Sequence, residues 1–132
     1  MQESIFTQII NGTIPAHRVY EDGNTLAFLD IHPTQPGHTL VVPKVQVEFL
    51  WDLSDADYEA LMSTVKKVAR HLRTTLNAPY VGMKVIGVDV PHAHIHLIPF
   101  TTVAEYDMHP DTAAEPDHGA LAAMAATLRM ED

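Results

Sequence analysis

Only one stretch of this chain has the pattern of a long helix, and this limits the folds that the chain can adopt. Its apolar residues recur at intervals of three and four and therefore share one helix face: Leu61, Val65, Val68, Leu72 and Leu76. Ser54 is a suitable N-cap, and Asn77-Ala78-Pro79 is typical of a helix end. The spacing predicts a helix over 54–76.

Five shorter stretches have the composition of β-strands, and they are 17–21, 25–30, 39–42, 81–88 and 92–100. Asp22-Gly23-Asn24 predicts a hairpin turn between the first two. A parallel sheet would need a helical crossover between successive strands, and the chain offers only one long helix. The sequence therefore predicts an α+β fold: a five-stranded antiparallel sheet, the long helix, a short helix or extended arm at 4–11 and a C-terminal helical tail.

The chain of 132 residues has the length of one domain. We assign 1–108 to its main body and 109–132 to an acidic C-terminal tail with a short helix, which belongs to the same domain. The apolar stripe of that helix, at 119–129, is thin. Because 101–132 follows the last predicted strand directly, we expect it to pass near the mouth of the functional site, in its own or a partner subunit. Since the stripe is thin, deletion of 109–132 should alter substrate selection more than folding.

The overall charge excludes several classes of partner. Eight Lys and Arg residues stand against 17 Asp and Glu residues, a net charge of −9. Nucleic acids and anionic membranes are bound by clustered cations, so we expect neither as a partner.

Without cysteine, the chain can form no disulfide, thiolate zinc site or cysteine nucleophile. We see no signal peptide and no apolar stretch long enough to span a membrane, and we expect a soluble, cytoplasmic protein.

The most informative residues are three alternating histidines in the last predicted strand. On a strand, His92, His94 and His96 share one face, while the apolar residues between them face the core. The protonated forms of three neighbouring imidazoles repel one another, which holds at least one ring neutral near pH 7. Such a cluster suits either a metal cation or a phosphate.

Two chemical interpretations follow from this cluster. In the first, the three histidines coordinate zinc or a similar ion in a metal-dependent hydrolase. In the second, a neutral imidazole attacks phosphorus and forms a covalent intermediate, while its neighbours orient it, donate to phosphate oxygens and protonate the leaving group.

The histidines lie in a longer motif that resembles a known family. The motif is Pro91-His92-Ala93-His94-Ile95-His96-Leu97-Ile98-Pro99, and further stretches match in order and spacing at Ile5-Phe6, 9–15, Glu21-Asp22, 26–31 and 38–44. Over residues 4 to about 100, the chain resembles the nucleotide-binding, Hint-like branch of the histidine triad (HIT) superfamily. The resemblance implies the HIT-like fold, a homodimer with two sheets joined edge to edge, and no cofactor.

The resemblance also implies an activity and a set of site residues. The activity is hydrolysis of purine nucleoside monophosphate derivatives with phosphoramidate-type P–N or related phosphorus linkages. His94 matches the nucleophile, His92 and His96 its flanking residues, and His38 a fourth histidine that supports the triad from behind. Asp30 matches a ribose-binding acid. The apolar slot for a purine base matches Ile5, Phe6, Phe28 and Ile31.

The chain departs from the family pattern at two places. Ser4, Thr7 and Gln46 stand where many relatives have zinc ligands, so we expect no structural zinc. Val81, Val88 and Asp89 stand where the best-known branch places phosphate-binding Asn, Gln and Ser. Asp89 would repel a phosphate unless it is protonated or paired with an imidazolium. Two alternatives therefore stay open: a nucleotide-binding or interaction module with little turnover, and the three-histidine metal-dependent hydrolase.

Overall fold

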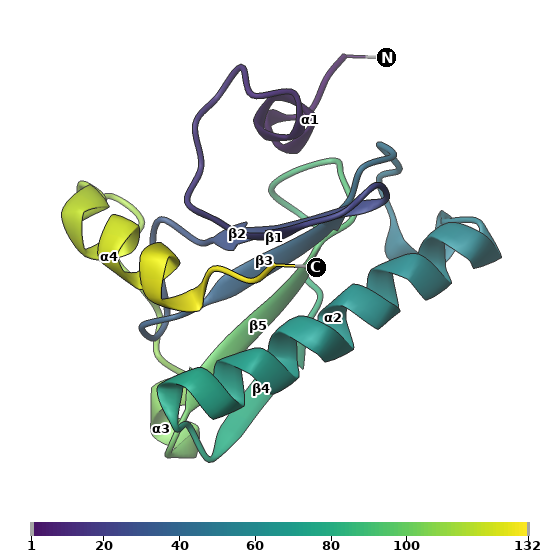
Figure 1. Ribbon diagram of the computed structural model, residues 1–132. Helices are drawn as coiled ribbons and strands as arrows, with labels where there is room; N and C mark the ends of the chain where they lie inside the picture. Colours follow the sequence, from purple (N-terminus) through teal and green to yellow (C-terminus); the bar gives the residue numbers. More distant parts are fainter. Residues whose placement is uncertain (1, 132) are drawn as a thin grey trace.

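The computed structural model, which describes residues 2–131, is a single antiparallel sheet with helices on both faces (Figure 1). The strands are β1 (Arg18–Glu21), β2 (Thr25–Leu29), β3 (Thr39–Pro43), β4 (Tyr80–Lys84) and β5 (Ile95–Phe100). The helices are α1 (Ile5–Ile10), the 3-10 turn η1 (Leu50–Asp52), α2 (Asp55–Leu76), α3 (Val103–Tyr106) and α4 (His118–Leu128). Strand order is β1-β2-β3-β5-β4, and every neighbouring pair is antiparallel. The predicted α+β fold with a five-stranded antiparallel sheet is confirmed.

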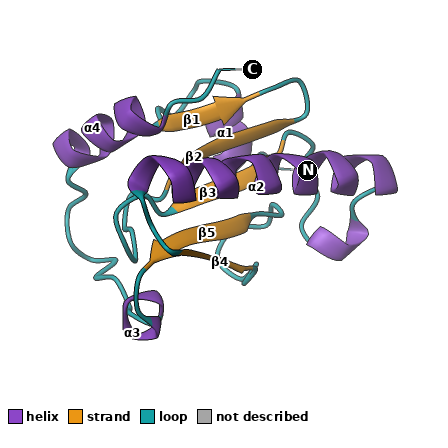
Figure 2. Cartoon of the chain, turned by 60° about the horizontal axis from the view of Figure 1, so that its bottom comes forward, coloured by secondary structure: helices purple, strands orange, loops and turns teal. Residues whose placement is uncertain are grey.

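The long helix α2 lies across one face of the sheet, and α1 lies on the other (Figures 1 and 2). Alternate strand residues therefore enter two separate apolar clusters. On β2, Ala27 and Leu29 pack toward α2, whereas Leu26 and Phe28 pack toward α1. The two-residue period of the strands thus builds a core on each side.

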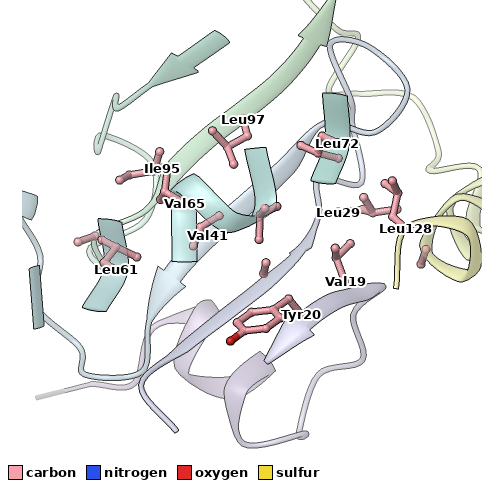
Figure 3. Close-up of a cluster of buried hydrophobic side chains, with 14 of the residues drawn as sticks. Val19, Tyr20, Leu29, Val41, Leu61, Val65, Leu72, Ile95, Leu97 and Leu128 are labelled. Atoms are coloured by element: carbon pink, nitrogen blue, oxygen red, sulfur yellow. The ribbon is translucent and has the colours of Figure 1, made fainter. Parts of the chain in front are cut away.

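The larger core lies between α2 and the sheet (Figure 3). Leu61, Val65 and Leu72 of α2 face the sheet, as their spacing predicts. From the strands they meet Val41, Ile95 and other side chains of the same face. α2 begins after Ser54, whose hydroxyl accepts from the Asp57 backbone N–H at 3.1 Å. It ends at Asn77, which adopts a left-handed conformation with φ 52°.

The two predicted strands that flank the loop 85–94 are shorter in the structure. β4 ends at Lys84 instead of residue 88, and β5 begins at Ile95 instead of residue 92. β5 pairs with β3 only as far as Val41↔Ile95, and Gly87 has a φ of 72° that extended strands do not use. Both limits leave 85–94 as a loop on the α1 side of the sheet.

The helix α3, which the sequence analysis did not predict, carries an aromatic side chain onto the sheet. Its Tyr106 lies over Gly82 of β4, and a Cβ atom at position 82 would overlap the ring. Phe100 contacts the same ring, with centroids 5.1 Å apart. Gly82 is therefore required by this close approach.

The C-terminal helix α4 belongs to the core, which corrects the expectation of a thin apolar stripe. Leu121, Ala125 and Leu128 join the cluster under α2, and the Met130 N–H donates to the Val19 carbonyl at 2.8 Å. Small alanine side chains let this helix approach α2 and β1 closely, which a count of large apolar residues does not reveal. Among the described residues, no helix combines the length and apolar character needed to cross a bilayer.

Candidate active site

A cavity of about 330 Å³ opens on the α1 side of the sheet, between α1, the strands β2 and β3, and the loop 85–94. Eight of the ten residues that the sequence analysis proposed for the site line it: Ile5, Phe6, Phe28, Asp30, Ile31, Asp89, His94 and His96. The other two, His38 and His92, are buried behind the wall and contact the lining histidines. The structure thus brings together residues up to 91 positions apart in the chain.

His94 is held in one orientation at the wall of this cavity. Its Nδ1 lies 2.8 Å from the backbone carbonyl oxygen of His92. Because a carbonyl only accepts, Nδ1 must carry a hydrogen, and in the neutral imidazole Nε2 then carries the lone pair. Every fully buried side-chain nitrogen or oxygen in the described part of the chain has a partner. Nε2 of His94 makes no hydrogen bond to that part and is therefore accessible from the cavity.

A chain of hydrogen bonds fixes His96 in the complementary state. The Thr34 backbone N–H donates to Nδ1 of His38 at 3.0 Å, so the other nitrogen of His38, Nε2, carries its hydrogen. Nε2 lies 3.0 Å from Nδ1 of His96 and donates to it. His96 must then carry its own hydrogen on Nε2. The two neighbouring rings of His94 and His96, 5.1 Å apart, thus offer one lone pair and one N–H.

The electrostatic environment agrees with neutral rings. Burial, and next the positive charge of His96, lowers the pKa of His38 to about 3. Burial, and next the charges of His94 and Lys84, lowers the pKa of His96 to about 4, although Asp89 opposes this. Burial raises the pKa of Asp30, whose Oδ1 accepts from the His32 backbone N–H at 2.8 Å. Both His38 and His96 are neutral near pH 7.

His92 differs from the other two histidines of the motif. Its ring is fully buried, and it lies outside the cavity lining. The Pro43 carbonyl oxygen lies 2.8 Å from Nε2, and the Ser4 hydroxyl lies 2.8 Å from Nδ1. Because β5 begins at Ile95, the three histidines do not share one strand. The alternation still holds, since Ala93, on the opposite side, packs into the α2 core.

The hydrogen bonds also test whether these residues fit a metal ion. Both nitrogens of His92 and Nδ1 of His94 are already bonded, so the triad presents no set of three lone pairs. Ligand atoms of Asp30, His38 and His96 lie within 4.8 Å of one another. However, Nδ1 of His38 accepts from Thr34, so a neutral His38 keeps its hydrogen on Nε2, where an ion would bind. The arrangement fits a hydrogen-bonded site better than a metal centre.

Other parts of the wall were not found by sequence reasoning. Apolar side chains from α1, the following turn, β2, β3 and the loop 85–94 contribute to the cavity wall: Ile9, Ile14, Pro15, Ala16, Leu29, Leu40, Ile86 and Val90. Val88, which the sequence analysis named, also lines the cavity. The spacing of Ile5 and Ile9 on one helix face is a signal that could have found the α1 wall. Val81, in contrast, packs against the α2 core and does not line the cavity.

The C-terminal segment lies beside the cavity without lining it. Within residues 2–131, no residue beyond His96 lines the cavity. The segment runs beside the loop that follows Asp30, since Nε2 of His32 lies 3.0 Å from the Ala114 carbonyl oxygen. Asp30 and Ile31 line the cavity, and the effect of the tail on substrate selection stays a prediction.

Comparison with known proteins identifies the family. The HIT domain profile matches residues 11–103. A HIT-like protein of Borreliella burgdorferi is 39% identical over 106 residues, covering 75% of this chain and 76% of that protein. The adenosine 5'-monophosphoramidase of Schizosaccharomyces pombe is 36% identical over 96 residues, covering 72% of each chain.

Solved structures agree with the sequence comparison. A HIT-like protein from Bartonella henselae superposes with a TM-score of 0.84 at 29% identity, covering 96% of this chain and 95% of the other. A Zn-bound histidine triad family protein from Mycobacterium smegmatis gives a TM-score of 0.74 at 30% identity, covering 94% of both. Fold, motif and sequence all lead to one assignment: this chain belongs to the HIT family.

Proposed function

We propose that this protein is a nucleotide-binding hydrolase acting on purine nucleoside monophosphate derivatives with phosphoramidate-type P–N or related phosphorus linkages. The observation that carries the proposal is the orientation of His94, whose Nε2 lone pair is accessible from a cavity large enough for a small ligand. Relatives from Schizosaccharomyces pombe and Saccharomyces cerevisiae, each 36% identical, are named adenosine 5'-monophosphoramidases, which supports this substrate class.

The reaction would proceed in two displacements at phosphorus. In the first, Nε2 of His94 attacks the phosphorus atom, the P–N bond breaks, and the nitrogen takes up a proton and leaves as an amine. In the second, water attacks the nucleotidyl-histidine and releases the nucleoside monophosphate. The Nδ1–H bond to the His92 carbonyl stabilises the positive charge that develops on His94. His96, with its hydrogen on Nε2, donates to the phosphoryl oxygen or the leaving group.

The remaining lining residues suit the nucleoside. Phe6 and Phe28 meet edge to face, with ring centroids 5.6 Å apart, and with Ile5 and Ile31 they form an apolar slot for a purine. Asp30 is partly exposed at the cavity wall and has a carboxylate oxygen to accept ribose hydroxyl hydrogen bonds. We assign Asp89 to the leaving-group end, because its charge acts on His96.

A homodimer is part of this proposal. β4 forms one edge of the sheet, and several large apolar side chains at and beyond this edge are exposed, including Tyr80, Met83 and Val85. The outer edge of β4 has no neighbouring strand among the described residues, and such an edge with exposed apolar side chains favours pairing with a second copy. Light scattering should give twice the chain mass of 14.6 kDa, and Met83→Lys should shift the protein toward monomer. Val103→Lys, an exposed position on α3, is the matched control.

The decisive experiment traps the intermediate. With adenosine 5'-phosphoramidate as substrate, rapid acid-free quenching should recover a nucleotidyl group on His94. His94→Asn should lose turnover by several orders of magnitude while it still binds AMP, since the base slot is unchanged. His109→Asn replaces an exposed histidine that does not line the cavity and should be fully active. Near-full activity of His94→Asn would exclude the mechanism.

The same experiment distinguishes the two alternatives. An interaction module with little turnover is favoured by Val88 and Asp89, which line the cavity and stand where the family pattern places phosphate-binding side chains. It would bind AMP but hydrolyse no phosphoramidate. A three-histidine metal enzyme would lose activity with a chelator and form no covalent intermediate.

A further inference from the structure

The N-terminal end of α1 is connected to the nucleophile by a buried chain of hydrogen bonds. Ser4 and His92 are both buried, and the Ser4 hydroxyl lies 2.8 Å from Nδ1 of the histidine. On the other side of the ring, Nε2 donates to the Pro43 carbonyl, so Nδ1 is an acceptor and Ser4 is the donor. The ring of His92 is therefore held at both nitrogens.

The backbone of the same residue holds His94. The His92 carbonyl oxygen is the group that accepts the Nδ1–H of His94 at 2.8 Å. If the His92 ring is held in place, its carbonyl is held as well, and so is the direction of the Nε2 lone pair of His94. One serine hydroxyl thus acts on the nucleophile through a single intervening residue.

Ser4 is itself held by further hydrogen bonds to Thr7 and Gln46. Its hydroxyl oxygen accepts the Thr7 backbone N–H at 3.0 Å, which makes it the N-cap of α1. Its backbone N–H donates to Oε1 of Gln46 at 2.8 Å, and the Thr7 hydroxyl donates to the same oxygen at 2.6 Å. α1 is thereby attached both to the segment that follows β3 and to the ring of His92.

The same helix forms a wall of the proposed base slot. Phe6, two residues after Ser4, lines the cavity and contacts the rings of His92 and His94, with centroids 5.8 and 5.0 Å away. A base that packs against Phe6 contacts α1, the helix whose N-cap Ser4 is hydrogen bonded to His92. Binding of the nucleoside and orientation of His94 are therefore mechanically connected.

We propose that Ser4 is a positioning residue for His94, which acts through the His92 ring and couples the seating of α1 to the orientation of the nucleophile. The inference rests on the proposed role of His94 in hydrolysis. It assigns a function in turnover to a residue that lies outside the segment 11–103 matched by the family profile.

The test compares Ser4→Ala with Ser4→Thr, which keeps both the hydroxyl donor and the helix cap. For adenosine 5'-phosphoramidate we expect Ser4→Ala to lower kcat about 10- to 100-fold, the usual effect of removing a group that orients an active-site histidine. KM should change by no more than about threefold, because the slot itself stays intact. Ser4→Thr should restore most of kcat.

A matched control separates positioning from the loss of a helix cap. Ser54→Ala removes the equivalent cap of α2, on the opposite face of the sheet, and should lower stability by a similar amount, about 1 kcal/mol. Its kcat should equal that of the parent. If Ser54→Ala lowers kcat as much as Ser4→Ala, the effect is one of stability and the inference is wrong.

A second readout does not depend on turnover. In ¹⁵N NMR spectra of the AMP-bound protein, His94 should be a pure Nδ1–H tautomer, and Ser4→Ala should convert it to a mixture. If the parent protein hydrolyses no phosphoramidate, the proposed function is wrong. The effect of Ser4→Ala on the tautomer of His94 can still be measured in that case. An unchanged tautomer in Ser4→Ala would overturn the inference, whether or not the parent is active.

Discussion

The α2 face and the α1 face of the sheet are built from alternate residues of the same strands, but they are filled differently. Under α2, mostly aliphatic side chains from the strands and from α2 and α4 form one continuous cluster. Under α1, a smaller cluster leaves a cavity of about 330 Å³, whose wall holds rings fixed by hydrogen bonds. The contrast suggests that one face supplies most of the stability and the other supplies the chemistry.

The largest expected effect is a difference between the two faces in how much a substitution lowers the free energy of unfolding. Leu97 of β5 is fully enclosed in the α2 core, so Leu97→Ala should lower the free energy of unfolding by about 2–5 kcal/mol. Val88 lines the cavity but is 79% exposed, and Val88→Ala should cost less than about 0.5 kcal/mol. Urea denaturation measures both. Equal losses would show that stability is shared between the faces.

The second prediction uses pH and concerns His38 and His96, two buried histidines on the α1 face. The pKa of His38 is lowered to about 3 and that of His96 to about 4. The unfolded imidazole has a pKa of about 6.5, so between these values the unfolded chain binds protons that the folded chain does not. Protonation of these two side chains in the unfolded chain should therefore lower the free energy of unfolding as pH falls from about 6.5 toward 4.

NMR titration of the histidine rings measures this directly. His38 and His96 should stay neutral from pH 8 to about 5. Titration of both rings near pH 6.5 would mean that the hydrogen-bonded chain from Thr34 to His96 does not form in solution.

A smaller effect is expected at the exposed wall of the cavity. Asp89→Ser removes a negative charge that acts on His96, and should lower KM for an anionic phosphoramidate by about threefold at low salt. Glu59→Gln removes an exposed charge of the same sign from α2 and should leave KM unchanged. An increase in KM for Asp89→Ser would instead assign Asp89 to substrate binding through a direct hydrogen bond.

The last prediction is that removing metal ions has no effect on stability. The polar groups of Ser4, Thr7 and Gln46 are hydrogen bonded to one another and to His92, and no metal-binding energy is needed to hold them. Chelator treatment should therefore leave the melting temperature unchanged. A fall of several degrees with EDTA would show that a metal contributes to the α1 face.

Sequence patterns predicted the features that depend on local spacing. The helix α2 and its cap at Ser54 follow from an apolar period and one polar side chain. The division of β5 into a histidine side and an apolar side follows from the two-residue period. The ends of β4 and β5 could not be predicted from local patterns, because a strand ends where its pairing with a neighbouring strand ends. The loop 85–94 has the composition of a strand but has no neighbouring strand to pair with in the described part of the chain.

The site could be predicted only in part for a related reason. The spacing of His94 and His96 is visible in the motif, but the proton position of His96 depends on Thr34 and His38, about 60 residues away. The role of His38 came from the family resemblance and not from any local pattern. The burial of α4 was missed because alanine contributes to packing through its small size.

The contact between Gly82 and Tyr106 restricts how this protein can change over evolutionary time. Any side chain at position 82 would occupy the space of the Tyr106 ring, so an alanine there becomes tolerable only after the ring has been replaced by something smaller. Loss of the ring first would remove its contact with Phe100. The two positions are therefore expected to covary among related sequences, and the order of their replacements should be constrained.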